Sequence, residues 1–97
     1  MRDFYNIYLI SDSTGETLDR IFLAIKAQFP KFSYTTKQYS FVRTKNQIER
    51  VIDECKKTDN IIILYTIVDN KLAKYLTNKC DGLNFPCFGV LGNLILN

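Results

Sequence analysis

Several residue types that carry common enzyme chemistry are missing from this sequence or scarce in it. There is no histidine, which excludes catalysis or metal binding by that side chain. The three cysteines, Cys55, Cys80 and Cys87, lack the C-x-x-C spacing of metal and redox motifs. The four glycines form neither G-x-G-x-x-G nor G-x-x-x-x-G-K-S/T. The sequence therefore predicts no metal centre, no identifiable catalytic residue and no Rossmann-type or Walker-type nucleotide cradle.

The chain has no run of charges of one sign and no long run of apolar residues. Thirteen basic residues against ten acidic ones give a net charge of +3 without any basic run, which does not predict a nucleic-acid partner. No apolar run approaches the roughly 20 residues that span a bilayer, so we predict no membrane partner. An odd number of thiols and the lack of a signal peptide before the first strand favour a reduced, cytoplasmic compartment.

What is present is the pattern of an α/β protein. The 97 residues, 46% of them hydrophobic, suffice for one domain covering residues 1–97. Residues rich in β-branched and aromatic side chains predict strands at 4–10, 32–42, 61–68 and 85–91. The polar positions in 32–42 indicate an exposed or edge strand. The nearly continuous apolar run 61–68 indicates a central parallel strand.

Helical spacing of apolar residues predicts three helices between these strands. The first has its apolar stripe at Leu18, Ile21, Phe22, Ile25 and Phe29 and stops at Pro30. The second begins at a capping box formed by Thr44 and Gln47 and continues to Cys55. The third is capped by Asp69, runs through Cys80 and ends at the Asp81-Gly82 signal.

This alternation predicts a three-layer α/β sandwich with a mainly parallel sheet, about four strands and three helices, of Rossmann or flavodoxin type. Four strands and three helices leave one face of the last strand without a predicted cover. We therefore expect the chain to be truncated or to pair with something else.

The loop after the first strand concentrates small and polar residues, and ligands of open parallel sheets bind at such loops. Its members are Ser11, Asp12, Ser13, Thr14, Gly15, Glu16 and Thr17. One interpretation is a helix start, with Ser13 and Glu16 as a capping box and Asp12 in a local turn. The other is a loop for phosphate or another oxyanion, because hydroxyls, a glycine and a helix N-terminus suit such a ligand. We expect both to hold in part, and the two carboxylates of the loop would oppose an anion that no cation accompanies.

Arg43 and Thr44 supply a second candidate group at the end of the second predicted strand. Arg43 can bind a phosphate or carboxylate through two hydrogen bonds, and Thr44 can donate one more. The alternatives are a solvated surface charge and a simple helix cap. Because the first two strands of such folds are usually neighbours, we expect Arg43 to lie near the first loop and supply its missing positive charge.

Five stretches together resemble the N-terminal part of the bifunctional kinase/pyrophosphorylase family that regulates pyruvate, phosphate dikinase and phosphoenolpyruvate synthase. They are "IYLISDSTGETL" (7–18), "AQFP" (27–30), "FVRT" (41–44), "ILYTIVD" (63–69) and "PCFGVLG" (86–92). The resemblance implies a longer protein whose C-terminal half binds nucleotide. Such a protein phosphorylates a threonine of the dikinase with ADP and removes that phosphate with inorganic phosphate.

For this chain the resemblance implies a fragment without the nucleotide-binding loop, acting in recognition of the dikinase or synthase, or in assembly with a missing C-terminal kinase half. ADP or ATP and phosphate would belong to the whole protein, and no cofactor is expected in this part. A second hypothesis is a small flavodoxin-like module, in which Thr14, Gly15 and Thr17 help to bind FMN or phosphate.

Overall fold

A computed structural model of the chain describes residues 4–28, 31 and 33–90. Strands and helices alternate from the first described residue. They are β1 (Phe4–Ser11), α1 (Glu16–Gln28), β2 (Ser33–Tyr39), α2 (Lys45–Cys55), β3 (Ile61–Thr66), α3 (Asn70–Leu83) and β4 (Cys87–Gly89).

The four strands form one sheet in the order β2-β1-β3-β4, and every neighbouring pair is parallel. This confirms the predicted α/β class. It also confirms the predicted places of two strands, since β2 is an edge strand with mostly exposed residues and β3 lies between β1 and β4. The chain moves outward from β1 to β2 and then crosses β1 to reach β3, so the strand order reverses between β1 and β3.

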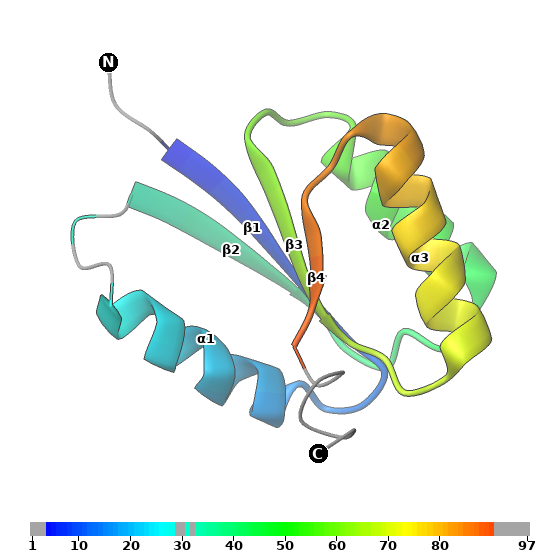
Figure 1. The fold of residues 1–97 in the computed structure, drawn as a ribbon, viewed down its shortest axis with the longest axis horizontal. Helices are drawn as coiled ribbons and strands as arrows, with labels where there is room; N and C mark the ends of the chain where they lie inside the picture. The colour runs from blue at the N-terminus through cyan, green and yellow to red at the C-terminus, as the bar shows by residue number, and fades with distance from the viewer. Residues whose placement is uncertain (1–3, 29–30, 32, 91–97) are drawn as a thin grey trace.

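The helices lie on both faces of the sheet, with α1 on one face and α2 and α3 on the other (Figure 1). Parallel strands are joined by right-handed crossovers. The connection through α1 runs from β1 to β2, and those through α2 and α3 run in the opposite direction across the sheet, so their helices lie on the other face. The larger core cluster joins the sheet to α2 and α3 and includes Ile10, Ile63 and Leu76, each with 0% exposure. The smaller cluster lies under α1 and contains Leu18 and Phe22 of that helix.

A polar contact joins α2 to α3 above the larger cluster. Glu49 accepts hydrogen bonds from the Tyr75 hydroxyl and from Lys79 Nζ, the latter at 2.9 Å. The hydrogen bond from Tyr75 and then that from Lys79 lower the pKa of the Glu49 carboxyl. The same contact raises the pKa of Lys79.

The end of α3 and the start of β4 differ from the prediction. The helix does not stop at Asp81-Gly82 but continues to Leu83, and Asn84 then takes the left-handed conformation with φ 60°. Asparagine tolerates this conformation and so replaces glycine as the helix terminator. The predicted strand 85–91 is only Cys87–Gly89 in the structure. Phe85 precedes it because its N–H closes the helix by donating to the Cys80 carbonyl at 2.9 Å.

The two strands that lead to the polar loops are also shorter than predicted. The β2 strand ends at Tyr39, because Phe41 turns the chain with φ 56° and Val42 leaves the sheet. The β3 strand ends at Thr66 instead of Val68. In the first helix Ile25 is 37% exposed, so the predicted apolar stripe packs mainly through Leu18 and Phe22.

Some predicted positions lie outside the described residues: Phe29, Pro30, Phe32 and Leu91. Among the helices that the structure describes, none is both long and apolar enough to cross a membrane.

Candidate functional site

Three loops meet at the carboxyl ends of β1, β2 and β3, and we call this surface the rim: residues 12–15, 40–44 and 67–69. Backbone hydrogen bonds join the loops to one another and to the ends of the neighbouring strands. Phe41 N–H donates to the Ser13 carbonyl at 3.0 Å, and Val42 N–H donates to the Ser11 carbonyl at 2.9 Å. Asp12 N–H donates to the Thr66 carbonyl at 3.2 Å. The three loops therefore form one continuous surface, on which Phe41 and Val68 are exposed beside the polar side chains.

Asp12 connects the first and third loops through its side chain as well. Its Oδ2 atom accepts a hydrogen bond from Val68 N–H at 2.9 Å. The predicted local turn at Asp12 is therefore wrong, because the carboxylate binds the backbone of a loop that is distant in sequence.

The serine and threonine hydroxyls of the first loop divide into buried and exposed ones. Ser11 is 1% exposed, and its Oγ accepts the Ser13 N–H at 3.1 Å and lies 3.3 Å from Ser13 Oγ. Thr14 Oγ1 lies within 3.4 Å of the Glu16 amide, and the Thr14 carbonyl accepts a hydrogen bond from Ser40 Oγ at 3.0 Å. Ser11 thus stabilises the loop from inside, whereas Ser13 and Thr14 are exposed residues whose hydroxyls also take part in contacts within the loop.

Helix α1 begins differently from the predicted capping box. Gly15 is the last residue before the helix, since its carbonyl accepts the Asp19 N–H at 2.9 Å. The interpretation of Ser13 and Glu16 as a capping box is therefore wrong, and Ser13 pairs with Ser11 instead. Gly15 has φ +91°, a conformation that costs other residues free energy. Glu16 and Thr17 are exposed in the first turn of α1.

Arg43 lies beside the first loop, as the strand neighbours predicted. Its Nε donates to the Asp12 carbonyl at 2.9 Å. Its guanidinium carbon lies 5.2 Å from the centre of the Phe41 ring, within range of a cation–π contact. Among the described residues the guanidinium forms no ion pair, and the side chain is exposed. Arg43 is therefore held in place at one nitrogen while the rest of its charge faces solvent.

Thr44 is confirmed as the cap of α2. Its Oγ1 accepts the Gln47 N–H at 3.2 Å, and Gln47 Oε1 accepts the Thr44 N–H at 3.0 Å and the Arg43 N–H at 2.6 Å. Gln47 thus fixes the backbone at Arg43 as well as the helix start. The capping role explains Thr44 without a ligand.

A hollow of about 400 Å³ lies in the rim and is lined by Asp12, Ser13, Arg43, Asp69 and Leu72. Asp69 caps α3, since its Oδ1 accepts the backbone N–H groups of Lys71 and Leu72 at 2.9 and 3.1 Å. The hollow thus combines one guanidinium with two carboxylates, both of which bind backbone amides. This mixed charge suits a protein surface better than a free phosphate ion.

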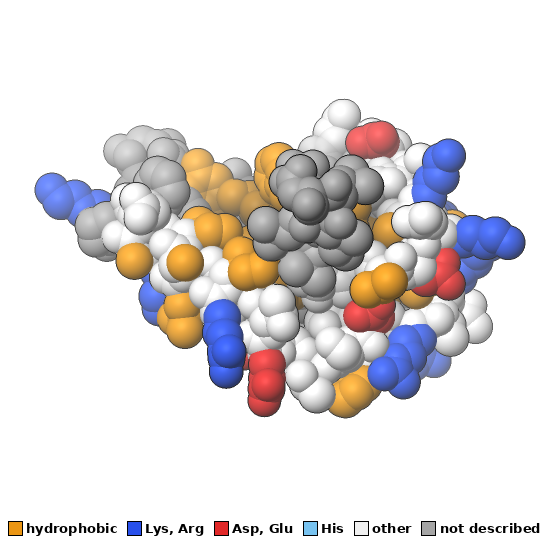
Figure 2. All heavy atoms as spheres, turned by 60° about the horizontal axis from the view of Figure 1, so that its bottom comes forward, with side chains coloured by type: hydrophobic (Ala, Val, Ile, Leu, Met, Phe, Trp, Pro, Cys, Tyr) orange, Lys and Arg blue, Asp and Glu red, His pale blue; other side chains and the backbone are white. Residues whose placement is uncertain are grey.

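Figure 2 views the molecule with the lower side of Figure 1 turned forward, and basic and acidic side chains are interspersed over it. No group of three or more His, Cys, Asp or Glu side chains in the described part of the chain is arranged to hold a metal ion.

The sequence did not predict that Phe41 supports Arg43 or that Ser40 supports Thr14. Neither residue type indicates a left-handed turn or a contact between distant loops, so the sequence carries no signal for these roles. Of the predicted site residues, Asp12, Ser13 and Arg43 come together at the hollow. Ser11, Gly15 and Thr44 serve the loops and helix starts, and Glu16 and Thr17 lie outside the hollow lining.

The cysteines lie away from the rim. Cys55 and Cys80 are fully buried in the larger core cluster, and Cys87 packs against it. Burial raises the pKa of the Cys55 thiol to about 12. A hydrogen bond with Cys80, and then burial, raise the pKa of the Cys87 thiol. The same hydrogen bond lowers the pKa of the Cys80 thiol. All three cysteines contribute to packing of the larger core cluster.

Fold and rim together define a class of protein: a doubly wound parallel α/β domain with a polar surface at the point where the strand order reverses. Residues 7–97 match the family model described as kinase/pyrophosphorylase. The chain belongs to the kinase/pyrophosphorylase family.

Curated relatives carry the name pyruvate, phosphate dikinase regulatory protein. One from Pelagibacter ubique is 65% identical over 97 residues, covering 100% of this chain and 35% of that protein. One from Agrobacterium fabrum is 40% identical over 94 residues, covering 97% of this chain and 34% of its own length. One from Bartonella bacilliformis is 36% identical over 90 residues, covering 93% of this chain and 32% of that protein. The chain spans about a third of the length of these relatives and matches their N-terminal part.

Proposed function

We propose that this chain is the part of a pyruvate, phosphate dikinase regulatory protein that recognises the partner enzyme, and that the rim is its binding surface. The observation that carries the proposal is the position of Arg43. The Asp12 carbonyl and the Phe41 ring fix its guanidinium at the edge of the 400 Å³ hollow, and its other donors face outward. A guanidinium fixed in this way loses little conformational entropy when it binds.

The chemistry of the rim favours a protein segment as its ligand. The Arg43 guanidinium suits a carboxylate or a phosphoryl group through two hydrogen bonds, and the Ser13 and Thr14 hydroxyls can add further ones. Asp12 and Asp69 oppose a bare anion but complement a basic or hydroxyl side chain in the same segment. A peptide with both kinds of group matches the surface.

The reaction of the whole protein is a separate part of the proposal. Threonine phosphorylation with ADP and phosphate-dependent removal would be carried out by the longer protein, with nucleotide bound outside this chain. The names of the relatives favour pyruvate, phosphate dikinase over the synthase as target. The absence of both glycine-rich nucleotide motifs from residues 1–97 supports a recognition role for this part. We place the protein in the cytoplasm, where disulfide-free thiols persist.

The test is a binding titration of the chain against immobilised pyruvate, phosphate dikinase, with the enzyme in its phosphorylated and unphosphorylated forms. Arg43→Ala removes charge-assisted hydrogen bonds of about 1.5–3 kcal/mol. The affinity for the enzyme should therefore fall by a factor of roughly ten or more. Arg50→Ala is the matched control, because Arg50 is an exposed arginine on α2 outside the hollow.

Equal affinities for the two variants would contradict the proposal. So would turnover by this chain alone in an ADP-dependent phosphorylation assay, because it would place the nucleotide site here. Saturable binding of FMN, followed by its absorbance, would replace the proposal with the flavodoxin-like alternative.

A further inference from the structure

The two faces of the sheet are covered unequally. On one face α2 and α3 lie side by side over the inner strands, and on the other α1 is the single helix that the structure describes (Figure 1). Helix α1 packs over Ile7, Leu9 and Leu64 through Leu18 and Phe22. Farther toward β4 this face carries apolar side chains that no described helix covers. Parallel sheets require cover on both faces, and residues 4–28, 31 and 33–90 leave this side incomplete.

We call this partly covered surface the β4 strip and define it by Ile62, Phe88 and Val90. Ile62 and Val90 are partly buried against the α1 cluster, so the strip continues that core. Phe88 is 55% exposed although it lies in a strand. The strand itself is three residues long and forms an edge of the sheet, where backbone groups are open to further pairing.

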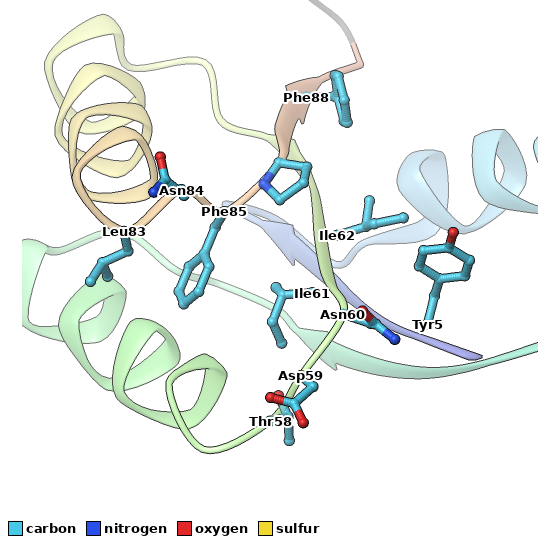
Figure 3. Close-up of a pocket in the computed structure, with 11 residues that line it drawn as sticks. Tyr5, Thr58, Asp59, Asn60, Ile61, Ile62, Leu83, Asn84, Phe85 and Phe88 are labelled. Carbon is cyan, nitrogen blue, oxygen red and sulfur yellow. The ribbon is translucent and has the colours of Figure 1, made fainter. Parts of the chain in front are cut away.

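A hollow of about 550 Å³ extends the strip around the start of β3. Tyr5, Ile62 and Phe88 lie on the α1 side of it, and Leu83 and Phe85 lie on the side of α2 and α3 (Figure 3). Its lining is largely apolar, in contrast to the charged hollow of the rim. An apolar segment is therefore the occupant that the lining suits.

We propose that the chain that follows the matched region in the longer relatives packs a helix beside α1 and covers the β4 strip. About two-thirds of the Pelagibacter ubique relative lies beyond the match, and the match is its N-terminal part. In sequence, that continuation follows β4, the strand that carries Phe88, with residues 90–97 between them. A surface that continues an existing core and carries an exposed aromatic is typical of a permanent interface, in contrast to a transient one.

The proposal concerns assembly and is independent of the recognition role of the rim. It uses none of the residues that line the rim hollow, and β4 and β2 are opposite edges of the sheet. Failure of the Arg43 titration would leave it intact.

The test compares this chain with a version extended by the segment that follows the match in the Pelagibacter ubique relative. Hydroxyl-radical footprinting measures the oxidation rate of single side chains. Leu23 is the internal control, because it is 54% exposed and lies on α1. We expect the oxidation rate of Phe88 to fall several-fold in the extended chain while that of Leu23 stays the same. Unchanged oxidation of Phe88, or an equal fall at both residues, would overturn the proposal.

Two further measurements keep the proposal falsifiable if the extended chain does not fold. Hydrogen exchange of the intact Pelagibacter ubique protein should be slower in the segment aligned with residues 87–90 than in this chain alone, with the segment aligned with β2 unchanged. Equal or faster exchange at 87–90 would overturn the proposal. Sedimentation of this chain over a range of concentrations tests the competing occupant. A dimer that protects Phe88 would show that a second copy covers the strip.

Discussion

Replacing Thr44 separates its capping role from any role in binding. Thr44→Ala removes the Oγ1 that accepts the Gln47 N–H at 3.2 Å, while the backbone N–H of residue 44 can still donate to Gln47 Oε1. Loss of such a cap costs about 1 kcal/mol, which lowers the melting temperature of a domain of this size by roughly 4–8 °C. Ile48, Val51 and Ile52 continue to hold α2 on the core, so the loss should not exceed this range.

The assay is thermal unfolding followed by circular dichroism at fixed pH and salt. Thr44→Ser is the control, because serine keeps the hydroxyl and caps at least as well as threonine. We expect the serine variant to melt near the wild type and both variants to keep their affinity for the dikinase, since the cap explains this residue. An alanine variant as stable as the wild type would refute the capping argument. Normal stability with lost binding in the serine variant would show that the threonine methyl contacts the partner.

Three further predictions concern other polar and thiol groups. Asp12→Ala removes the acceptor of the Val68 N–H and should lower the free energy of unfolding by about 1 kcal/mol in urea titrations, with Asp12→Asn losing less. Hydrogen bonds from Tyr75 and then from Lys79 lower the folded-state pKa of Glu49, so these contacts stabilise the fold above pH 4.5 and are lost as pH falls through the folded pKa. Glu49→Gln should remove this part of the acid dependence of the melting temperature. Cys55, whose thiol pKa is about 12, should resist iodoacetamide at pH 8 until the chain unfolds, and mass spectrometry of labelled peptides would show any native labelling.

The sequence predicted the order and type of the elements because local signals dominate there. The apolar run that begins at Ile61 and the helical stripe from Ile48 to Cys55 each fix one element and the face that it buries. The ends of the strands depend on contacts that are distant in sequence. The β2 strand stops because Phe41 and Val42 donate to carbonyls of the first loop, and no local pattern encodes those bonds.

The same distinction separates the predicted from the unpredicted parts of the rim. Arg43 could be placed beside the first loop because parallel neighbouring strands end at the same edge. The inward position of Ser11 was missed, although a signal existed. Side chains alternate along a strand, so Ser11 shares the face of Ile7 and Leu9 once β1 is extended by one residue. The strand boundary decided whether Ser11 belonged to the loop or to the core.

The positions of the rim and the β4 strip bear on how a longer protein of this family would be organised. The rim lies across the carboxyl ends of β1, β2 and β3, and Phe88 lies on the outer strand at the opposite edge from β2. A continuation that covers the strip would leave Arg43 accessible to a partner enzyme, whereas a continuation over β2 would crowd it. Substitutions at Arg43 and Phe88 should therefore act independently. Their effects should add in a double-mutant cycle, and a strong coupling between them would place both residues in one interface.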